Sequence, residues 1–223
     1  MYMAKFDTSG NLLWKKTMGG PLDDYTYSIK TDSNGDIYIT GTCSENADFD
    51  GGDDTSLIHI NGPSNSGIIF LAKYSSLGDL IWVKGMSSAN GFGLGKDIEF
   101  AANGDVILTG NFKVTVDFDP SPAVLNFSAI STNYYDIFIT RFTSNGDLVW
   151  AKQIGGSNYD EVKGMALDAS DNIYLTGYFM STVDFDPGPA VTTLTAPVNR
   201  KLFYLAKYSG LGDLVWVNYN AQN

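Results

Sequence analysis

Gly146-Asp147-Leu148-Val149-Trp150 is the stretch that decides the fold, because the chain contains four versions of it. Each version has a glycine, an asparagine or aspartate, two aliphatic residues and a tryptophan. The tryptophans are Trp14, Trp82, Trp150 and Trp216, which lie 68, 68 and 66 residues apart. A sequence that repeats at a fixed long period is typical of a repeat architecture, in which each copy forms one structural unit.

Each repeat unit contains four short segments with the pattern of a β-strand. In the first, Lys96 to Ala101, apolar and polar residues alternate, as in a strand with one buried face. A turn such as Asn103-Gly104 leads to a second strand, because both residue types tolerate positive φ. A long connection precedes the third strand, such as Phe70 to Tyr74, and the tryptophan strand closes the unit. No segment has a helical pattern.

Four antiparallel strands joined by tight turns and repeated along the chain predict the blades of a β-propeller. We expect an all-β fold with about three and a half blades, which form a partial or open propeller. Residues 1–223 are then one propeller segment. It has a half blade at 1–18 and full blades at about 24–86, 93–156 and 160–219. A solenoid, whose units are shorter, and a sandwich, which needs no repeat, are the competing folds.

The composition of the chain excludes several classes of partner. Its formal net charge is -11, whereas a nucleic-acid surface needs a basic face to neutralise phosphates. The same charge argues against docking on anionic lipid. No apolar run is long enough to span a bilayer, so we expect no membrane insertion. Cys43 is the one cysteine, which rules out an intrachain disulfide and a cysteine zinc site.

The amino-terminal residues resemble the inside of a repeat. Met1 to Phe6 lack the basic and then apolar pattern of a signal peptide, and they match the third strand Tyr204 to Tyr208. An open row of blades leaves the apolar faces of its two end blades uncovered. We therefore expect further blades in a longer chain, or self-association of this one.

Three phrases carry a resemblance to a known family. Asp36 to Gly41, Asn172 to Gly177 and Val183 to Gly188 resemble the bacterial beta-propeller repeat family called SBBP. The resemblance recurs in each unit and covers essentially the whole chain. It implies a secreted or cell-surface bacterial protein, and it implies no catalytic residues, because the pattern of the family is structural. The family name anticipates seven blades, of which this chain supplies about half.

An Asp-Phe-Asp motif recurs in the connection between the second and third strands. Its carboxylates are Asp48, Asp50, Asp117, Asp119, Asp184 and Asp186. Strand-like alternation places both carboxylates on one side and the phenylalanine on the other. In one interpretation the phenylalanine anchors the loop while the carboxylates accept backbone N–H bonds. In the other, the carboxylates bind Ca²⁺, although two of them fall short of the six to eight oxygens that Ca²⁺ takes. The sequence indicates no other cofactor.

Other candidates for chemistry have weaker support. Asp23-Asp24 and Asp160-Glu161 precede the first strand of two units, but the middle unit has no carboxylate there, so we expect solvated loops. His59 is the one histidine, and it lies in the long connection of the first full unit. We expect it to serve on the surface or in packing. The chain has no Gly-x-Ser-x-Gly elbow, and we expect no enzyme.

Binding residues should break the repeat, whereas framework residues should keep it. The tryptophans share one repeat position, so we expect them to pack between blades. The connections Gly51 to Gly67 and Asn126 to Tyr135 differ most between units and are the candidates for recognition. The sequence favours a non-catalytic module for binding, adhesion or scaffolding, with a protein or glycan ligand. The alternatives are a carbohydrate-active lyase or hydrolase with carboxylates at the ring centre, and a purely structural spacer.

Overall fold

The computed structural model of the chain describes residues 1–20, 22–51, 67–87 and 90–220. This part of the chain is built from strands and contains no helix, so the prediction of an all-β fold is confirmed. In particular, no helix among the described residues could cross a membrane. His59 and nearly all of the connection Gly51 to Gly67 lie outside the described residues.

The full blades are antiparallel sheets, each with four strands in sequence order, and two short strands of the third blade's connection extend the sheet of the second blade to six strands. The first blade consists of β3 (Tyr25–Thr31), β4 (Ile37–Cys43), β5 (Ile68–Tyr74) and β6 (Leu80–Met86). The second consists of β7 (Phe92–Phe100), β8 (Val106–Lys113), β11 (Asp136–Phe142) and β12 (Leu148–Gly156). The third consists of β13 (Asp160–Leu167), β14 (Ile173–Phe179), β17 (Leu202–Tyr208) and β18 (Leu214–Tyr219).

A hairpin of β1 (Tyr2–Phe6) and β2 (Leu12–Thr17) precedes the first blade. Its register shifts between Lys5 and Phe6, and the pair of β5 and β6 shifts at the corresponding place, between Lys73 and Tyr74. The hairpin therefore corresponds to the third and fourth strands of a blade. Among the described residues, β2 is the strand that pairs with β1, so the other edge of β1 has no strand beside it.

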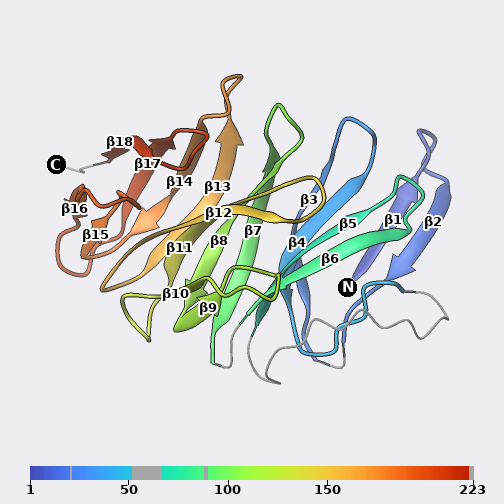
Figure 1. Ribbon diagram of the computed structural model, residues 1–223, viewed down its shortest axis with the longest axis horizontal. Helices are drawn as coiled ribbons and strands as arrows, with labels where there is room; N and C mark the ends of the chain where they lie inside the picture. Colours follow the sequence, from blue (N-terminus) through green and yellow to red (C-terminus); the bar gives the residue numbers. More distant parts are fainter. Residues whose placement is uncertain (21, 52–66, 88–89, 221–223) are drawn as a thin grey trace.

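The blades stand side by side in an open row, with the two chain ends at opposite ends of the row (Figure 1). The first strand of each blade packs on the preceding blade: β7 contacts β3 and β4, and β13 contacts β7 and β8. The blades thus meet face to face, as in a propeller, and the sheets do not close into a ring.

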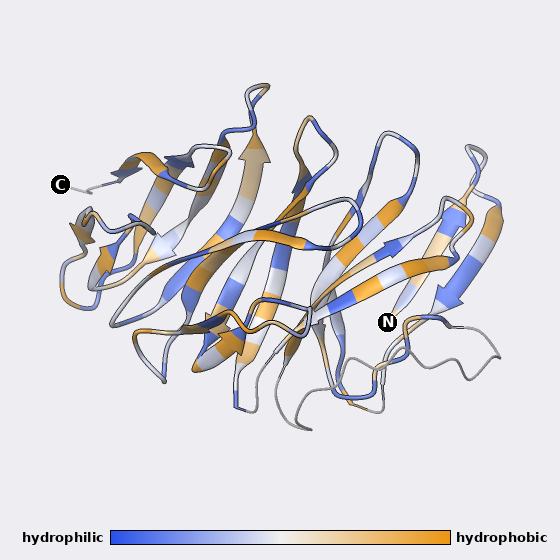
Figure 2. Cartoon of the chain, viewed as in Figure 1, coloured by the Kyte–Doolittle hydropathy of each residue, from blue (hydrophilic) through white to orange (hydrophobic). Residues whose placement is uncertain are grey.

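Three apolar clusters fill the blades and the spaces between them, and Figure 2 shows the alternating hydropathy of the strands. One cluster joins Ile69 and Leu71 of β5 to Ile98 of β7, and all three are fully buried. Burying an aliphatic or aromatic side chain of this size stabilises the fold by roughly 1.5–3 kcal/mol. The alternation in the sequence thereby produces the face-to-face packing of the blades.

The tryptophans of the fourth strands pack between blades, as their shared repeat position predicts. Three of the four indole rings lie against a turn glycine of the following blade. The pairs are Trp14 with Gly78, Trp82 with Gly146, and Trp150 with Gly212. Trp216 has no following blade in the structure, and its ring meets Tyr174 of its own blade at 6.1 Å between centroids.

The long connections contain strands that their sequences did not reveal. The second blade carries the hairpin β9 (Thr115–Asp117) and β10 (Asn126–Ser128), and the third carries β15 (Thr182–Asp184) and β16 (Thr193–Thr195). β15 pairs with Gly155–Gly156 at the end of β12, in the preceding blade. Bridges between Ser87 and Asp117 and between Gly19 and Asp48 repeat this contact at the other two boundaries. The connections therefore fasten each blade to the one before it.

The end faces of the row are uncovered, as the sequence predicts for an open propeller segment. Ile29 of β3 is 56% exposed, whereas Ile98 at the same repeat position is fully buried. At the other end, Phe203 of β17 is 64% exposed, whereas its counterpart Ile69 is fully buried. The two end faces are thus the two halves of the contact that the blades make with each other inside the row.

Candidate functional site

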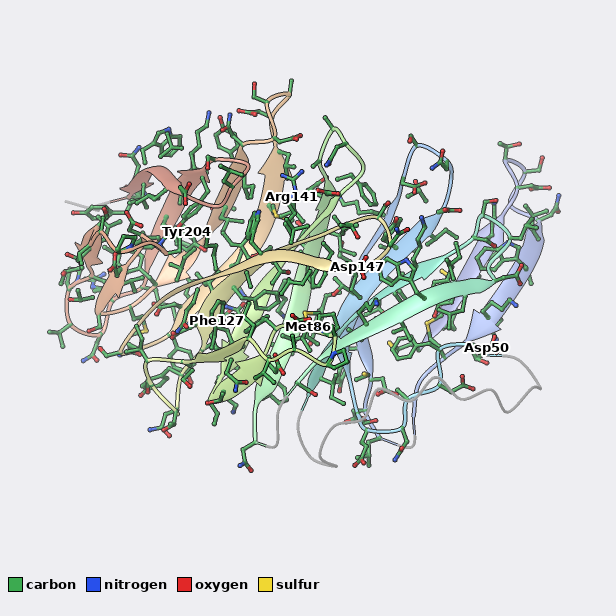
Figure 3. All side chains as sticks on the ribbon, viewed as in Figure 1. Asp50, Met86, Phe127, Arg141, Asp147 and Tyr204 are labelled. Atoms are coloured by element: carbon green, nitrogen blue, oxygen red, sulfur yellow. The ribbon has the colours of Figure 1, made fainter. Side chains whose placement is uncertain are left out.

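The two edges of the blade row differ in their loops. The connections between second and third strands emerge at one edge, called here the connection edge, and tight turns occupy the opposite turn edge (Figure 1). In Figure 3, Phe127 lies toward the connection edge and Arg141 toward the turn edge. Loops on a rigid scaffold are where binding residues concentrate, so the connection edge is the place to look for a site.

The Asp-Phe-Asp motifs lie at the connection edge, where their phenylalanines anchor the loops. Phe49, Phe118 and Phe185 are buried, with exposed fractions of 1%, 0% and 0%. The hydroxyl of Tyr74 donates to the main-chain oxygen of Phe49 at 2.9 Å, and Tyr208 does the same to Phe185 at 3.0 Å. The loops of the first and third blades are thus tied to the third strand of their own blade, whereas Phe142 holds the position of the tyrosine in the second blade.

The carboxylates of the motif accept backbone N–H groups. Oδ1 of Asp117 accepts from Asp119 and Leu125 at 3.1 and 2.8 Å. Oδ1 of Asp184 accepts from Asp186 and Thr192 at 3.0 and 2.9 Å, and Asp48 accepts from Asp50 at 2.9 Å. These bonds close the loop in the way that Asx turns do.

The motifs stand one to a blade. Within the described residues, no three His, Cys, Asp or Glu side chains gather in a way that could hold a metal ion. The calcium interpretation of the six motif aspartates stays a prediction.

The expectation of solvated loops was wrong for two acidic residues before the first strands. Asp160 belongs to β13 and is fully buried. Asp24 is half-buried, and its carboxylate accepts from the backbone N–H groups of Gly20 and Ser44 at 2.6 and 2.8 Å. The physical reason is that both residues stand where a blade begins to pack on its predecessor, so their side chains point into the boundary between blades.

Asn111, Asp136 and Asp160 form a buried polar group, called here the aspartate cluster, between the second and third blades. Their exposed fractions are 1%, 0% and 0%. Nδ2 of Asn111 donates to the main-chain oxygens of Asp160 at 3.0 Å and Asp136 at 3.4 Å. Oδ2 of Asp136 accepts from Nε2 of Gln153 at 2.7 Å and from the backbone N–H of Ile130 at 3.0 Å. The amide of Asn111 therefore lies between the two aspartates.

Burial raises the pKa of both carboxyl groups, because desolvation disfavours the charged form. The pKa of Asp160 rises to about 8, first through burial and then through the charge of Asp136. Burial also raises the pKa of Asp136 to about 6. The backbone N–H groups of Gly156 and Met180 partly offset the rise at Asp160, but neither makes a hydrogen bond of good geometry with its carboxyl oxygens.

A pocket of about 470 Å³ lies next to the aspartate cluster. Gln153, Ile130 and Gly155 line it, and all three touch Asp136: a Cβ on Gly155 would fall on the carboxyl group. Phe127, labelled in Figure 3, lines the same pocket, together with Asp184 and Asp186. The volume of the pocket is within the range of small-molecule sites, and its charged lining residues are two aspartates and Lys152.

Aromatic and lysine side chains cover the connection edge above the aspartate cluster. This aromatic–lysine patch consists of Phe92, Lys113, Tyr134, Tyr135, Tyr159, Tyr178 and Lys201. The rings of Tyr134 and Tyr159 have centroids 4.6 Å apart. Nζ of Lys201 lies 4.1 Å from the centroid of Tyr178, a distance typical of cation–π contacts.

The aspartate cluster breaks the repeat, and the patch above it does so in part. At the boundary between the first and second blades, Ile68 stands in place of Asp136 and Gly93 in place of Asp160, since the paired strands have the same register there. Thr42 likewise corresponds to Asn111. In the patch, Gly67 corresponds to Tyr135. The backbone N–H of Gly93 donates to the main-chain oxygen of Gly67, and the backbone N–H of Asp160 donates in the same way to that of Tyr135. The framework is built at the first boundary without these side chains.

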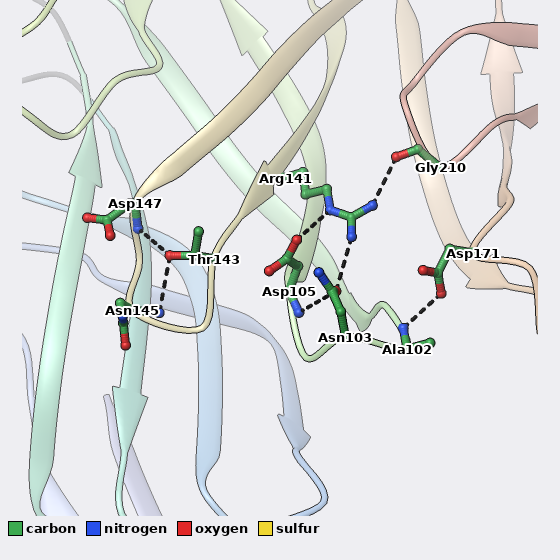
Figure 4. A network of polar contacts seen from close by, with 9 residues as sticks. All are labelled: Ala102, Asn103, Asp105, Arg141, Thr143, Asn145, Asp147, Asp171 and Gly210. Atoms are coloured by element: carbon green, nitrogen blue, oxygen red, sulfur yellow. Dashed lines mark hydrogen bonds and ion pairs between the residues drawn. The ribbon is translucent and has the colours of Figure 1, made fainter.

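At the turn edge, Arg141 connects the second and third blades (Figure 4). Its Nε donates to Asp105 at 2.8 Å and its Nη1 donates to the main-chain oxygen of Gly210 at 3.0 Å. The backbone N–H of Ala102 donates to Asp171 at 2.8 Å. Every group in this network has a partner within the turns of the framework, so the network positions blades and offers little to a ligand.

Sequence reasoning placed part of the site and missed the rest. It pointed to the connection Asn126 to Tyr135, which supplies two tyrosines of the patch. It missed Asp136, although the repeat contains the signal: an aspartate heads β11 where Ile68 and Leu202 head the corresponding strands. A polar residue at an apolar repeat position marks a place where function can depart from framework.

Comparison with known proteins agrees with this architecture. The family model described as SBBP, beta-propeller repeat, matches residues 14–49 and 149–178. The two matches start at equivalent places of two repeat units, at or next to a tryptophan of the fourth strand. The resemblance to SBBP repeats that the sequence predicts is thereby confirmed.

A curated relative contains WD repeats. The chain is 24% identical over 194 residues to an uncharacterized WD repeat-containing protein of Acanthamoeba polyphaga mimivirus. The match covers 80% of this chain but 14% of the relative. Together with the fold, the two comparisons define this chain as an all-β segment of propeller-type repeats, a class of protein scaffold.

Proposed function

We propose that this chain is a non-catalytic binding scaffold whose aromatic–lysine patch receives a partner at the connection edge. The observation that carries the proposal is the departure from the repeat at one boundary between blades. A purely structural spacer has no use for residues that differ from one boundary to the next. A binding site, in contrast, must distinguish one part of a repetitive surface from the others.

The chemistry of the patch suits recognition. Tyrosines bring large rigid surface with one polar end, which is why they are enriched where proteins bind partners. Tyr159 is 38% exposed, and Tyr134 and Tyr135 are half-buried, so their rings are held in place yet reachable. Lys113 and Lys201 add positive charge to a chain that is acidic as a whole.

A protein partner is our leading proposal. The WD repeat type of the curated relative supports it, as does the mixed aromatic and basic surface. A glycan is the second candidate, because tyrosine rings also stack on sugar rings. In line with the resemblance to SBBP repeats, we propose that the protein works outside the cell or at its surface. Adhesion is one form that such binding would take.

A carbohydrate-active enzyme is the alternative from another class. Such an enzyme uses a pair of carboxyl groups that flank the substrate. Asp136 and Asp160 are a pair of carboxyl groups with raised pKa values, but both are fully buried beneath the connection edge. A substrate cannot reach them without opening the boundary between blades, which favours the non-catalytic proposal.

The test compares two double variants of the chain. Tyr134→Ala with Tyr159→Ala removes the stacked pair of the patch. Leu77→Ala with Leu211→Ala is the matched control, because both leucines are exposed, at 70% and 69%, in turns at the opposite edge. Each protein is immobilised for selection from a random peptide display library. The same protein is applied in solution to a glycan array.

We expect peptides selected on the unaltered chain to bind the control equally and the patch variant at least about tenfold more weakly, which is 1.4 kcal/mol. Signal on the glycan array alone would replace the protein partner by a glycan. Peptides that bind the patch variant as strongly as the unaltered chain would show that recognition occurs elsewhere on the surface. An absence of binders on both supports would favour the spacer.

A further inference from the structure

Four buried oxygen atoms of the aspartate cluster have no hydrogen-bond partner. They are Oδ1 of Asn111, Oδ1 of Asp136, and both carboxyl oxygens of Asp160. All four are acceptors. Burying a polar group without a partner costs free energy, and burying an ionised carboxylate in this way costs much more. When the two carboxyl groups are ionised, these oxygens therefore require a positive or donating group, and no described side chain supplies one.

No basic side chain neutralises the aspartates. The ion pairs between described residues involve other carboxylates, and none includes Asp136 or Asp160. The donors near the cluster are already in use: Nε2 of Gln153 serves Oδ2 of Asp136, and Nδ2 of Asn111 serves two main-chain oxygens. What remains is a set of oxygens with two carboxylates and one amide.

We propose that Asn111, Asp136 and Asp160 bind a hard divalent cation, Ca²⁺, between the second and third blades. Carboxylate and amide oxygens are the ligands that Ca²⁺ prefers, and a carboxylate can supply one oxygen or two. The four free oxygens give part of a coordination shell of six to eight. Water supplies the remaining ligands.

The adjacent pocket lies within one residue of Asp136, so water is close to the cluster. Three of its lining residues, Ile130, Gln153 and Gly155, are in contact with Asp136. Asp184 and Asp186 line the same pocket and outnumber its one basic residue, Lys152, which is paired with Asp213 at 3.3 Å, so the charge of the lining favours cations. Because Asn111 and Asp136 belong to the second blade and Asp160 to the third, the bound cation holds the two blades together.

The proposed site is distinct from the Asp-Phe-Asp motifs. Those carboxylates accept backbone N–H bonds in their own loops, and their pattern recurs in each unit. The aspartate cluster occurs at one boundary only. Ile68, Gly93 and Thr42 hold the corresponding positions between the first and second blades. Between the hairpin and the first blade, Asp24 holds the position of Asp160, and its carboxylate accepts backbone N–H bonds from Gly20 and Ser44.

The test titrates Ca²⁺, and Mg²⁺ in parallel, into the chelator-treated chain by calorimetry and follows thermal unfolding. Asp136→Asn and Asp160→Asn, made singly and together, remove charge from the cluster. The carboxyl oxygens of Asp160 accept no hydrogen bond, so Asp160→Asn should leave the folded state intact. Near-ultraviolet circular dichroism checks that each variant is folded. Asp48→Asn with Asp117→Asn is the control, because it makes the same change in charge in two loops away from the cluster.

We expect one Ca²⁺ per chain and a rise in Tm, at least about tenfold weaker binding in each cluster variant, and unchanged binding in the control. Failure of Ca²⁺ to bind would overturn the proposal, as would a cluster variant that binds like the unaltered chain. If the control alone lost binding, the motif aspartates and not the cluster would be the site. A chain that binds neither cation but has a higher Tm at low pH would show that protons occupy the cluster instead.

Discussion

Gly78 lies against the indole ring of Trp14: a Cβ at Gly78 would stand 3.2 Å from three atoms of the ring. Gly78 is in the turn between β5 and β6, whereas Trp14 is in β2 of the hairpin before that blade. The pair therefore joins the half blade to the first full blade. Two further pairs, with Trp82 and Trp150, repeat the contact along the row.

Gly78→Ala should destabilise the chain more than Gly104→Ala. Both glycines have positive φ, +88° and +84°, so both alanines carry a strain of about 1–2 kcal/mol. Nothing lies within 4 Å of the added methyl at Gly104, whereas the indole must move at Gly78. Urea unfolding midpoints of the two variants measure the difference. Equal midpoints would contradict a role for the indole contact in joining the blades.

The stability of the metal-free chain should fall as pH rises from about 4 to about 8. Burial raises the pKa of Asp160 to about 8 in the folded chain, against 3.8 for an ordinary aspartate, so in this window the folded state holds a proton that the unfolded state has lost. Each such proton gives a slope of about 1.4 kcal/mol per pH unit. Asp136, with its pKa raised to about 6, adds to the slope below pH 6.

Urea unfolding in chelator at a series of pH values measures this slope, and Asp160→Asn is the comparison. The amide does not titrate, so the variant should lose most of the slope between pH 6 and 8 and leave that of Asp136 below it. A variant with the same pH profile as the unaltered chain would show that another group holds the proton.

The motif aspartates should act as acceptors of backbone N–H bonds. Asp184→Ala removes the acceptor for Asp186 and Thr192 and should cost about 1–3 kcal/mol, whereas Asp184→Asn keeps an acceptor oxygen and should cost much less. Thermal unfolding with and without Ca²⁺ tests the competing interpretation. If these residues bind calcium, both variants lose a Ca²⁺-dependent part of Tm.

The isolated chain should self-associate through its end faces. Phe203 and Leu205 are 64% and 46% exposed, whereas their counterparts Ile69 and Leu71 are fully buried between blades. Phe203→Asp with Leu205→Lys should reduce association, measured by sedimentation velocity, with little loss of stability. Val198→Asp is the control, because Val198 is 89% exposed in a loop. An unaltered chain that stays monomeric at high concentration, with a high Tm, would contradict this prediction.

Much of the fold could be predicted from the sequence, for a local reason. Alternation in segments such as Lys96 to Ala101 records which face of a strand is buried, and Asn103-Gly104 records a turn; both signals act over a few residues. Each strand and turn pattern recurs in every repeat unit, so patterns that are weak singly together predict the four-stranded blade strongly. The accessory strands β15 and β16 could not be predicted, because three residues are too few to show an alternation of apolar and polar residues.

The site could be predicted only in part. That Asn126 to Tyr135 departs from the repeat is visible in the sequence, and it supplies Tyr134 and Tyr135. That Asp160 is buried is not visible, because its neighbours along the chain are polar and its burial comes from the preceding blade. Asp24 shows the same limit, since the backbone groups that it accepts from lie in segments before and after its strand.

The sequence by itself determined the repeat unit, its four strands and the place of the tryptophans, because these depend on residues close to one another along the chain. The tertiary structure alone decided which side chains meet across a boundary between blades. Asn111, Asp136 and Asp160 come from three strands separated along the chain, and Asn111 meets Asp160 only when the second and third blades pack. Contacts of that kind follow from the geometry of packing, and no local pattern encodes them.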